Sequence, residues 1–380
     1  MNIGIACYPT YGGSGVVAAE LGKSLAERGH KIHFISYAMP IRLDGFVGNI
    51  VFHEVEVSNY PLFDFPLYTP ALAGKIIEVA KFEKLDIIHA HYAIPHAISA
   101  YLAKQILGPQ SGMKIVTTLH GTDITLIGLE PDYLPVMKFS IEQSDGVTAV
   151  SRFLREKTLT NYQIDKDIQV IPNFVDINKY RRIDATKICH SLAPHREKVL
   201  IHVSNFRNVK RVQDVVRIFN LVLQKVPSKL LLVGDGPDRS GCEQLVRELN
   251  INDKVKFLGK QLELVPLLSA SDLFLMPSQS ESFGLSALEA MACELPVVAT
   301  SIGGLPELII HGETGYIAEI GDIDRMARYA VELLTNDARY KLFAAASRKR
   351  AVEMFSADKV VNQYEQYYEQ VLSEQSVPAK

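Results

Sequence analysis

Two glutamates, Glu281 and Glu289, lie on either side of a glycine-containing turn and could accept hydrogen bonds from the hydroxyls of a polyol. The apolar run at residues 272–276 predicts a buried strand, residues 277–282 a loop, and residues 284–293 a helix whose first turn has no acidic residue. Such a helix N-terminus attracts an anion, for example a phosphate. The pattern predicts a site for a sugar and a ribose joined by a pyrophosphate. Two solvated surface glutamates are the alternative.

A group of basic residues, Arg207, Lys210 and Arg211, lies between a predicted strand at residues 199–203 and a predicted helix at residues 212–225. Two fixed cations facing a diphosphate leaving group would stabilise charge that grows in the transition state. A solvated basic face is the alternative. Gly234 follows the next predicted strand, residues 229–233, and we expect its turn at the same edge.

A polar cluster, Thr118, His120 and Asp123, ends the predicted strand at residues 114–119. Open parallel sheets bind ligands at the carboxyl ends of their strands, which favours a functional His120 over a structural one. Asp123 either orients His120 or caps the loop. His89 and His91 end another strand; we expect their imidazoles on opposite faces, so this pair predicts no metal site.

The glycine loop at residues 12–15 matches the dinucleotide fingerprint when Ala18 takes its third position. The fingerprint also needs an acidic residue at the end of the second strand, and the nearest one, Asp44, comes several residues too late. We therefore interpret the loop as an anion-accepting loop, with the Ser14 hydroxyl and backbone amides as donors. A tight turn without a ligand is the alternative, and a nicotinamide oxidoreductase is the rival function.

Length and composition limit the remaining possibilities. A chain of 380 residues is longer than one hydrophobic core usually fills, so we expect two domains. Its net charge of -3 does not indicate the basic surface that nucleic-acid binding needs. The four cysteines show no Cys-x-x-Cys pattern, which favours free thiols in a reducing compartment. No stretch reaches 18 apolar residues, so we expect a cytoplasmic protein without membrane insertion.

Alternating strand and helix patterns predict two doubly wound, mostly parallel sheets of the α/β class. The first domain is expected at residues 1–170 plus 356–380, and the second at residues 171–355. Residues 177–197 are expected to be irregular. The tail at residues 356–372 predicts a helix whose stripe of Val360, Tyr364, Tyr367 and Tyr368 packs into a core.

The segment from Glu281 to Glu289, with Phe283, Gly284 and the following residues 296–307, resembles the Glu-x7-Glu signature of the retaining family 4 glycosyltransferases. The resemblance spans nearly the whole chain and implies a GT-B fold: two Rossmann-like domains and a cleft between them. It implies an acceptor-binding N-terminal domain, a nucleotide-sugar-binding second domain, and a C-terminal helix that returns to the first. The family usually has Gly-Arg-x-x-x-x-Lys before Lys210; here Asn205 stands at the Arg position, so Arg207 or Arg211 must supply that charge.

The opening at residues 6–15 and the segment at residues 203–211 are similar to the members of the family that begin bacillithiol biosynthesis. That similarity implies transfer of N-acetylglucosamine from UDP-GlcNAc to the hydroxyl of L-malate, with retention and without a cofactor or metal. The residues implied as catalytic are His120, Lys210, Glu281 and Arg207. Those implied for the donor are Gly15, Asn205, Gly234, Ser282, Phe283, Gly284, Leu285 and Glu289; those for the acceptor are Gly13, Ser14, Tyr92, Thr118 and Arg152.

Other functions stay open from the sequence. A family member with another acceptor and a sugar-nucleotide epimerase share the expected architecture. The oxidoreductase is disfavoured by the missing ribose acid. The sequence permits a homo-oligomer without specifying one.

Overall fold

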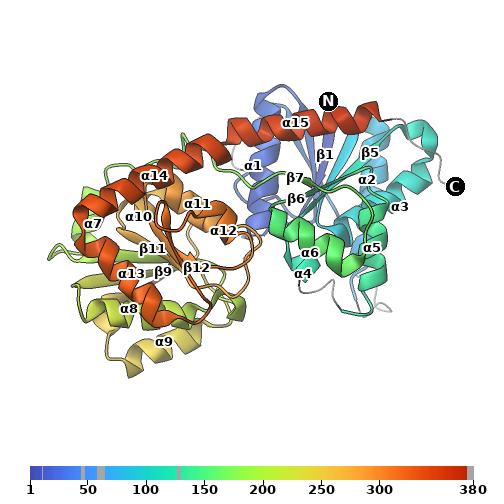
Figure 1. The fold of residues 1–380 in the computed structure, drawn as a ribbon. Coiled ribbons are helices and arrows are strands. Elements are labelled where there is room, and N and C mark those ends of the chain that lie inside the picture. Colours follow the sequence, from blue (N-terminus) through green and yellow to red (C-terminus); the bar gives the residue numbers. More distant parts are fainter. Residues whose placement is uncertain (11, 44–47, 58–64, 126–129, 375–380) are drawn as a thin grey trace. The chain divides into compact units, whose positions relative to one another are not determined.

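The computed structural model describes residues 1–10, 12–43, 48–57, 65–125 and 130–374. The chain divides into two compact units (Figure 1). Unit 1 comprises residues 1–173 and 357–380, and unit 2 comprises residues 174–356. The sequence had placed the division after residues 170 and 355.

Unit 1 is built on a seven-stranded sheet in which every pair of neighbouring strands is parallel. In spatial order its strands are β3 (Ile50–Glu54), β2 (Lys31–Ser36), β1 (Asn2–Ala6), β4 (Ile87–His91), β5 (Lys114–Leu119), β6 (Gly146–Ala149) and β7 (Gln169–Val170). Their apolar runs are buried because helices cover a parallel sheet on both faces. The predicted doubly wound fold is confirmed, and β7 is an additional strand.

The helices of unit 1 are α1 (Gly13–Glu27), α2 (Tyr68–Glu83), α3 (Ile98–Leu107), α4 (Thr122–Thr125), α5 (Leu134–Glu142), α6 (Arg152–Tyr162) and α15 (Ala357–Ser373), with short helical turns η1 (Ala93–Ala97) and η2 (Pro109–Ser111). The predicted loop at residues 12–15 is wrong beyond Gly12, because α1 begins at Gly13. Gly12 is extended and caps the helix, and Val16 N–H donates to its carbonyl at 3.2 Å. Gly13, Ser14 and Gly15 therefore form the first turn of α1 and not a loop.

The C-terminal helix α15 packs on unit 1 beside α1 (Figure 1). Val360, Tyr364 and Tyr368 are at most 1% exposed, which confirms the predicted core stripe. Tyr367 is only half-buried, and its hydroxyl accepts a hydrogen bond from Val147 N–H at 2.7 Å. The helix thus closes the core of unit 1 and satisfies the backbone of β6.

Unit 2 contains a six-stranded sheet, also parallel throughout. Its strands in spatial order are β10 (Val255–Gly259), β9 (Ser228–Val233), β8 (Lys198–Val203), β11 (Leu273–Met276), β12 (Val297–Thr300) and β13 (Gly315–Ala318). Its helices are α7 (Thr186–Leu192), α8 (Val212–Leu223), α9 (Arg239–Glu248), α10 (Val265–Ser269), α11 (Leu285–Ala292), α12 (Leu305–Leu308), α13 (Ile323–Thr335) and α14 (Asp337–Phe355), with η4 (Asn208–Lys210) and η5 (Asn252–Lys254). The expectation that residues 177–197 are irregular is wrong for residues 186–192, which form α7.

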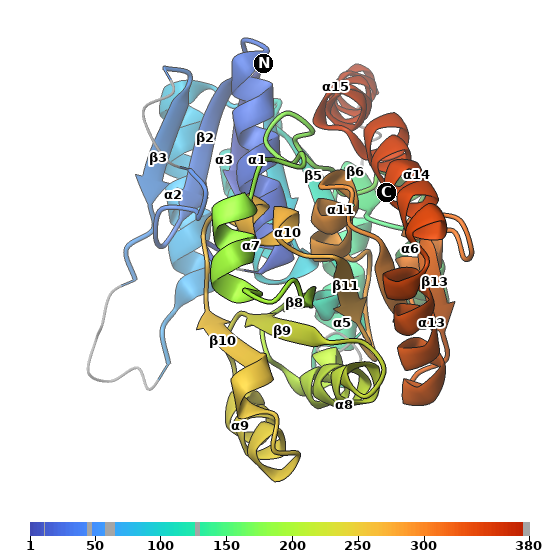
Figure 2. The ribbon, with the colours of Figure 1, turned by 90° about the vertical axis from the view of Figure 1, so that its left-hand side faces the viewer.

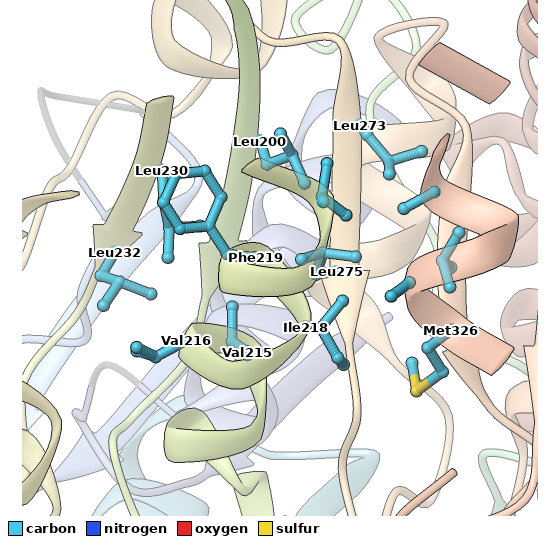
Figure 3. Close-up of a cluster of buried hydrophobic side chains, with 14 of the residues drawn as sticks. Leu200, Val215, Val216, Ile218, Phe219, Leu230, Leu232, Leu273, Leu275 and Met326 are labelled. Atoms are coloured by element: carbon cyan, nitrogen blue, oxygen red, sulfur yellow. The ribbon is translucent and has the colours of Figure 1, made fainter. Parts of the chain in front are cut away.

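The core of unit 2 lies between α8 and the sheet (Figure 3). Val215, Ile218 and Phe219 are fully buried at the i, i+3, i+4 spacing of one helix face. They pack on Leu200 and Leu275 of the central strands. Figure 2 shows α13 beside α8 and α11 beside α14. These helices fix the ends of the strands from which the polar loops leave.

Both sheets reverse their strand order at one point, between β1 and β4 in unit 1 and between β8 and β11 in unit 2. In open α/β sheets the loops at this switch point leave in opposite directions and form a crevice at the carboxyl edge. Five of the predicted site residues follow these four strands: Gly13 and Ser14 follow β1, Tyr92 follows β4, Lys210 follows β8 and Glu281 follows β11. The topology therefore gathers them into one cluster in each unit.

Candidate functional site

In unit 2 an ion pair joins the loops after β8 and β11. Lys210 Nζ lies 2.7 Å from Glu281 Oε1, and the Ser278 hydroxyl donates to the same oxygen at 2.9 Å. The two charged side chains are 21% and 10% exposed, so both are mostly shielded from water while keeping an open side. The structure thus brings together two residues that are 71 positions apart and that the sequence analysis assigned to leaving group and sugar.

Two glycines support Glu281 from behind. Gly304 N–H donates to the Glu281 carbonyl at 3.0 Å. A Cβ on Gly303, which has φ of +60°, would lie 1.8 Å from the same carbonyl oxygen. Thr300 Oγ1 donates to the Ser278 carbonyl at 2.6 Å and holds the start of the loop. Sequence reasoning missed these supporting roles, although the Gly-Gly pair lies within the segment that resembles the family.

A neutral histidine lies beneath the pair. His202 on β8 is fully buried between the Leu275 carbonyl, 2.8 Å from Nδ1, and the Ser204 hydroxyl, 2.7 Å from Nε2. Burial lowers its pKa to about 4, and the Lys210 charge adds to this shift. The proton on Nδ1 faces the carbonyl, so His202 orients the Ser204 end of the β8 loop without contributing charge.

The structure separates the two arginines that could replace the family Arg. The Arg211 guanidinium forms an ion pair with Asp214 in the first turn of α8, with Nε 2.6 Å from Oδ2. Arg207 is exposed, in the loop between Asn205 and Lys210. Because the Asp214 carboxylate is only 5% exposed, Arg211 is held to balance a buried charge. Arg207 is the better placed of the two for an anionic ligand.

Helix α11 follows the loop that carries Glu281 and begins one residue later than predicted. Gly284 caps it with φ of +98°, and its first turn carries no acidic residue. Ser282 and Leu285 are partly exposed, so the N–H groups of this turn are near solvent. Glu289 is 4% exposed on the same helix. These features suit a phosphate next to the helix N-terminus, and the ribose role of Glu289 stays a prediction.

The Phe283 side chain does not point to a ligand site. It is 3% exposed and packs edge-on against Phe355, with ring centroids 5.5 Å apart. The structure therefore argues against a side-chain contact with the donor and leaves only its backbone. Gly234 has φ of +125° and a Cβ there would be 1.7 Å from the Ser204 carbonyl oxygen, so this glycine permits the close approach of two site loops.

In unit 1, three hydroxyls meet where β1 and β4 end. The Tyr92 hydroxyl interacts with the side chains of Ser14 and Thr122. Burial, with the charge of Asp123, raises the Tyr92 pKa to about 12, so the phenol stays protonated and can donate. Tyr92 has φ of +97°, a strained value for a residue with a Cβ. Its backbone N–H donates to the Thr118 carbonyl at 3.0 Å, which helps to hold this conformation.

The first turn of α1 leaves Gly13 exposed and Gly15 buried. A Cβ on Gly15 would lie 2.5 Å from the Tyr8 carbonyl oxygen and 2.7 Å from that of Thr10. Gly15 is thus required for packing, whatever its predicted role toward the donor. Gly13 and Ser14 offer backbone N–H groups at a helix N-terminus, which suits a carboxylate. Arg152 is exposed at the start of α6, where Ser151 caps the helix by accepting from Leu154 N–H at 3.1 Å.

The prediction that His89 and His91 point to opposite faces is wrong. Residues two apart on a strand share a face, and the two rings lie 4.3 Å apart between centroids. His91 Nδ1 is 2.9 Å from His120 Nε2, and His89 Nδ1 is 2.7 Å from the Tyr368 hydroxyl. The three imidazoles form a row from α15 to His120, in which His89 and His91 are fully buried and His120 is partly exposed. Within the described ranges, no three His, Cys, Asp or Glu side chains form a group able to hold a metal ion.

Of two further residues near His120, Thr118 differs from expectation and Asp123 takes one of its two expected roles. Thr118 is fully buried, with its hydroxyl 2.7 Å from both His89 Nε2 and Thr148 Oγ1. The structure therefore argues against the predicted acceptor contact. Asp123 accepts from Gly121 N–H at 3.0 Å and from Ala93 N–H at 3.3 Å, so it caps the loops and does not orient the His120 ring. Burial raises the Asp123 pKa to about 6.

Comparisons with known proteins agree with this arrangement. The model for glycosyl transferases group 1 matches residues 186–350, and the model for glycosyltransferase family 4 matches residues 11–179. N-acetyl-alpha-D-glucosaminyl L-malate synthase of Bacillus anthracis is 52% identical over 373 residues, covering 98% of this chain and 97% of that protein. The chain belongs to the family 4 glycosyltransferases. A D-inositol 3-phosphate glycosyltransferase of Mycolicibacterium smegmatis is 27% identical to this glycosyltransferase, and the matched region covers 90% of this chain and 81% of that protein.

Solved structures share the GT-B fold of this glycosyltransferase. Sucrose-phosphate synthase from Thermosynechococcus elongatus has a TM-score of 0.82 at 22% identity, covering 98% of this chain and 99% of its own. Anabaena HepE in complex with UDP and glucose has a TM-score of 0.81 at 21% identity, with coverage of 97% and 99%. The expected fold class is therefore confirmed. Among the described residues no helix is long and apolar enough to cross a membrane.

Proposed function

We propose that this glycosyltransferase moves N-acetylglucosamine from UDP-GlcNAc to the hydroxyl of L-malate, with retention at the anomeric carbon. The observation that carries the proposal is the 52% identity, over nearly the full length of both chains, to the Bacillus anthracis protein named for that product. The same identity disfavours other acceptors.

Unit 2 is proposed to hold the donor. The N-terminus of α11 and Lys210 would meet the two phosphates, and Glu281 would accept from a sugar hydroxyl. Arg207, at the exposed part of the β8 loop, would supply the second cation. Glu289 is proposed for the ribose, where a buried carboxylate gains from accepting two hydroxyl donors. Lys210 and Glu281 bond each other, which holds the two side chains close together at the proposed donor site.

Unit 1 is proposed to hold the acceptor. L-malate carries two carboxylates and one hydroxyl, and needs donors for four oxygens. The N–H groups at Gly13 and Ser14, the Ser14 and Tyr92 hydroxyls and the Arg152 guanidinium supply donors of that kind. Thr118 is left out of this set because its hydroxyl is engaged in the core.

The proposed chemistry is a substitution on one face of the sugar. The bond from the anomeric carbon to the phosphate oxygen breaks, and the malate oxygen forms its bond on the same side. The malate hydroxyl proton passes to the departing phosphate oxygen, whose growing negative charge faces Lys210 and Arg207. This step uses no protein nucleophile. We also propose that it needs no metal or other cofactor, because these cations and the helix N-terminus neutralise the diphosphate.

We further propose that the reaction takes place in the cytoplasm. All four cysteines are free thiols, three of them buried, which suits a reducing compartment. Burial raises the pKa of Cys7 to about 12, so this thiol does not ionise near neutral pH.

A UDP-release assay with UDP-GlcNAc and a panel of acceptors tests the proposed function. L-malate should support release, whereas D-malate, succinate and glycerol should give only background rates. Release with another hydroxy acid and not with L-malate would contradict the acceptor assignment. Conversion of UDP-GlcNAc to another sugar nucleotide without any acceptor would favour the epimerase.

The oxidoreductase has less support. β2 ends at Ser36, with no carboxylate at the position that a dinucleotide fingerprint requires, and Asp44 lies outside the described residues. NAD binding in calorimetry would revive this alternative.

A further inference from the structure

The imidazole of His91 packs against neighbouring groups, and one of its two ring nitrogens has a hydrogen-bond partner. It is fully buried at the end of β4, and its ring lies against that of His89. His96 Nδ1 donates to the His91 carbonyl at 2.6 Å, which fixes the backbone. His91 Nδ1 is 2.9 Å from His120 Nε2, whereas His91 Nε2 is buried without a hydrogen-bond partner among the described residues. This unpartnered nitrogen decides where the protons lie.

Both imidazoles are neutral near neutral pH. Burial lowers the pKa of His120 to about 3 and lowers that of His91 well below 6.5. A neutral imidazole has one N–H, so a single proton lies between His91 Nδ1 and His120 Nε2. Either ring can supply it, and the two choices leave different groups on His91 Nε2.

If His120 donated from Nε2, the proton of His91 would lie on its own Nε2, as a buried N–H without an acceptor. If His91 donates from Nδ1, its Nε2 keeps only an unpaired lone pair. Buried N–H groups without partners are rarer in proteins than unsatisfied acceptors, and an unmade donor bond costs the full desolvation of that group. The second arrangement is therefore the more stable one.

We propose that His91 is a positioning residue that fixes His120 in the tautomer with its proton on Nδ1. His120, which is partly exposed, then offers a hydrogen-bond donor to a ligand oxygen and has no free nitrogen to act as a base. The inference deepens the proposed function and rests on it only for the identity of that oxygen. It also explains why the acceptor proton must leave by another route, such as the departing phosphate oxygen.

Tautomers are read directly from two-bond proton–nitrogen correlation spectra of the protein labelled with nitrogen-15 histidine. His91→Asn and His120→Asn each remove one ring system and so assign the two residues. The expected spectrum of the wild-type protein has a protonated Nδ1 and a bare Nε2 for both. A protonated Nε2 on His120 would overturn the proposal. Because no substrate is needed, this result stands or falls separately from the acceptor assay.

Variants add a kinetic test. His91→Asn keeps an amide N–H near the position of Nδ1, so His120 should keep its tautomer and kcat should stay within about threefold of the wild type. His91→Leu removes the donor, so His120 is no longer held in one tautomer; its spectrum should show exchange between both, and kcat should fall by up to about tenfold, or about 1.4 kcal/mol. His33→Leu is the matched control, because His33 is also buried in unit 1 but bonds His53. Equal rates and unchanged His120 spectra in both His91 variants would refute the positioning role.

Discussion

The ion pair between Lys210 and Glu281 allows catalysis to be separated from stability. Its Nζ to Oε1 distance is 2.7 Å. At an effective dielectric constant of about 20, unit charges roughly 3 Å apart attract by about 5 kcal/mol before desolvation. The side chains are 21% and 10% exposed, between a surface pair and a buried one, so we expect a net stabilisation of about 1–2 kcal/mol.

Lys210→Met should therefore lower the free energy of unfolding by about 1–3 kcal/mol, because among the described residues the Glu281 carboxylate then keeps only the Ser278 hydroxyl as a hydrogen-bond partner. It should also lower kcat by about a hundredfold, or about 2.7 kcal/mol, because the leaving diphosphate loses a fixed cation. Adding Glu281→Gln removes the unpaired charge. The double variant should regain stability to within about 1 kcal/mol of the wild type, but its turnover should stay low.

Urea unfolding and UDP release measured on the four proteins of this cycle test the reasoning. If turnover recovered together with stability in the double variant, the pair would be a structural ion pair only. A kcat within about threefold of the wild type for Lys210→Met would refute the role of this lysine in leaving-group departure.

Four further predictions follow from the site and its surroundings. Gly303→Ala should lower stability by about 1–3 kcal/mol and lower turnover, since its Cβ would press on the Glu281 carbonyl; Gly312→Ala, with φ of +79° but open space, is the control in thermal unfolding. Arg207→Ala should lower kcat about tenfold at unchanged Tm, whereas Arg211→Ala should lower Tm because the buried Asp214 carboxylate then loses one ion pair and keeps the one with Arg217; the reverse pattern would exchange their roles. Chelation by EDTA should leave UDP release unchanged, and a loss restored by a divalent metal would contradict the metal-free reaction. Burial lowers the pKa values of His89 and His120 to about 3 and those of His96 and His202 to about 4, so below pH 6.5 the unfolded chain binds more protons than the folded protein. Tm should therefore fall as the pH drops from 6.5 toward 4, although the raised pKa of Asp123, about 6, acts in the opposite direction. A Tm that is constant or rises over this range would contradict the burial of these histidines.

The strands and the positions of the polar loops could be predicted from the sequence, because buried parallel strands are short apolar runs. β5 and β11 begin and end at the expected residues or within one of them. Since polar residues that follow such strands meet at one edge, Lys210 and Glu281 could be assigned to one cluster before their bond was seen. The spacing of Met326, Ala330 and Leu333, which are buried on one face of α13, is also typical of a helix.

Other features depend on contacts that are distant in sequence. The support of Glu281 by Gly303 and Ser278 depends on the loop after β12 meeting the loop after β11. The burial of Thr118 depends on α15, which follows it by more than two hundred residues. The row of histidines could have been predicted from the sequence, because side chains alternate along a strand and His89 and His91, two residues apart, must share a face of β4. The prediction of opposite faces applied this two-residue period wrongly.

A crystal structure of the protein with UDP tests the central claim most directly. We expect the diphosphate at the N–H groups of Gly284 and Leu285, next to Lys210, and the ribose hydroxyls on the Glu289 carboxylate. A nucleotide bound elsewhere on the protein, with these residues unoccupied, would contradict the account.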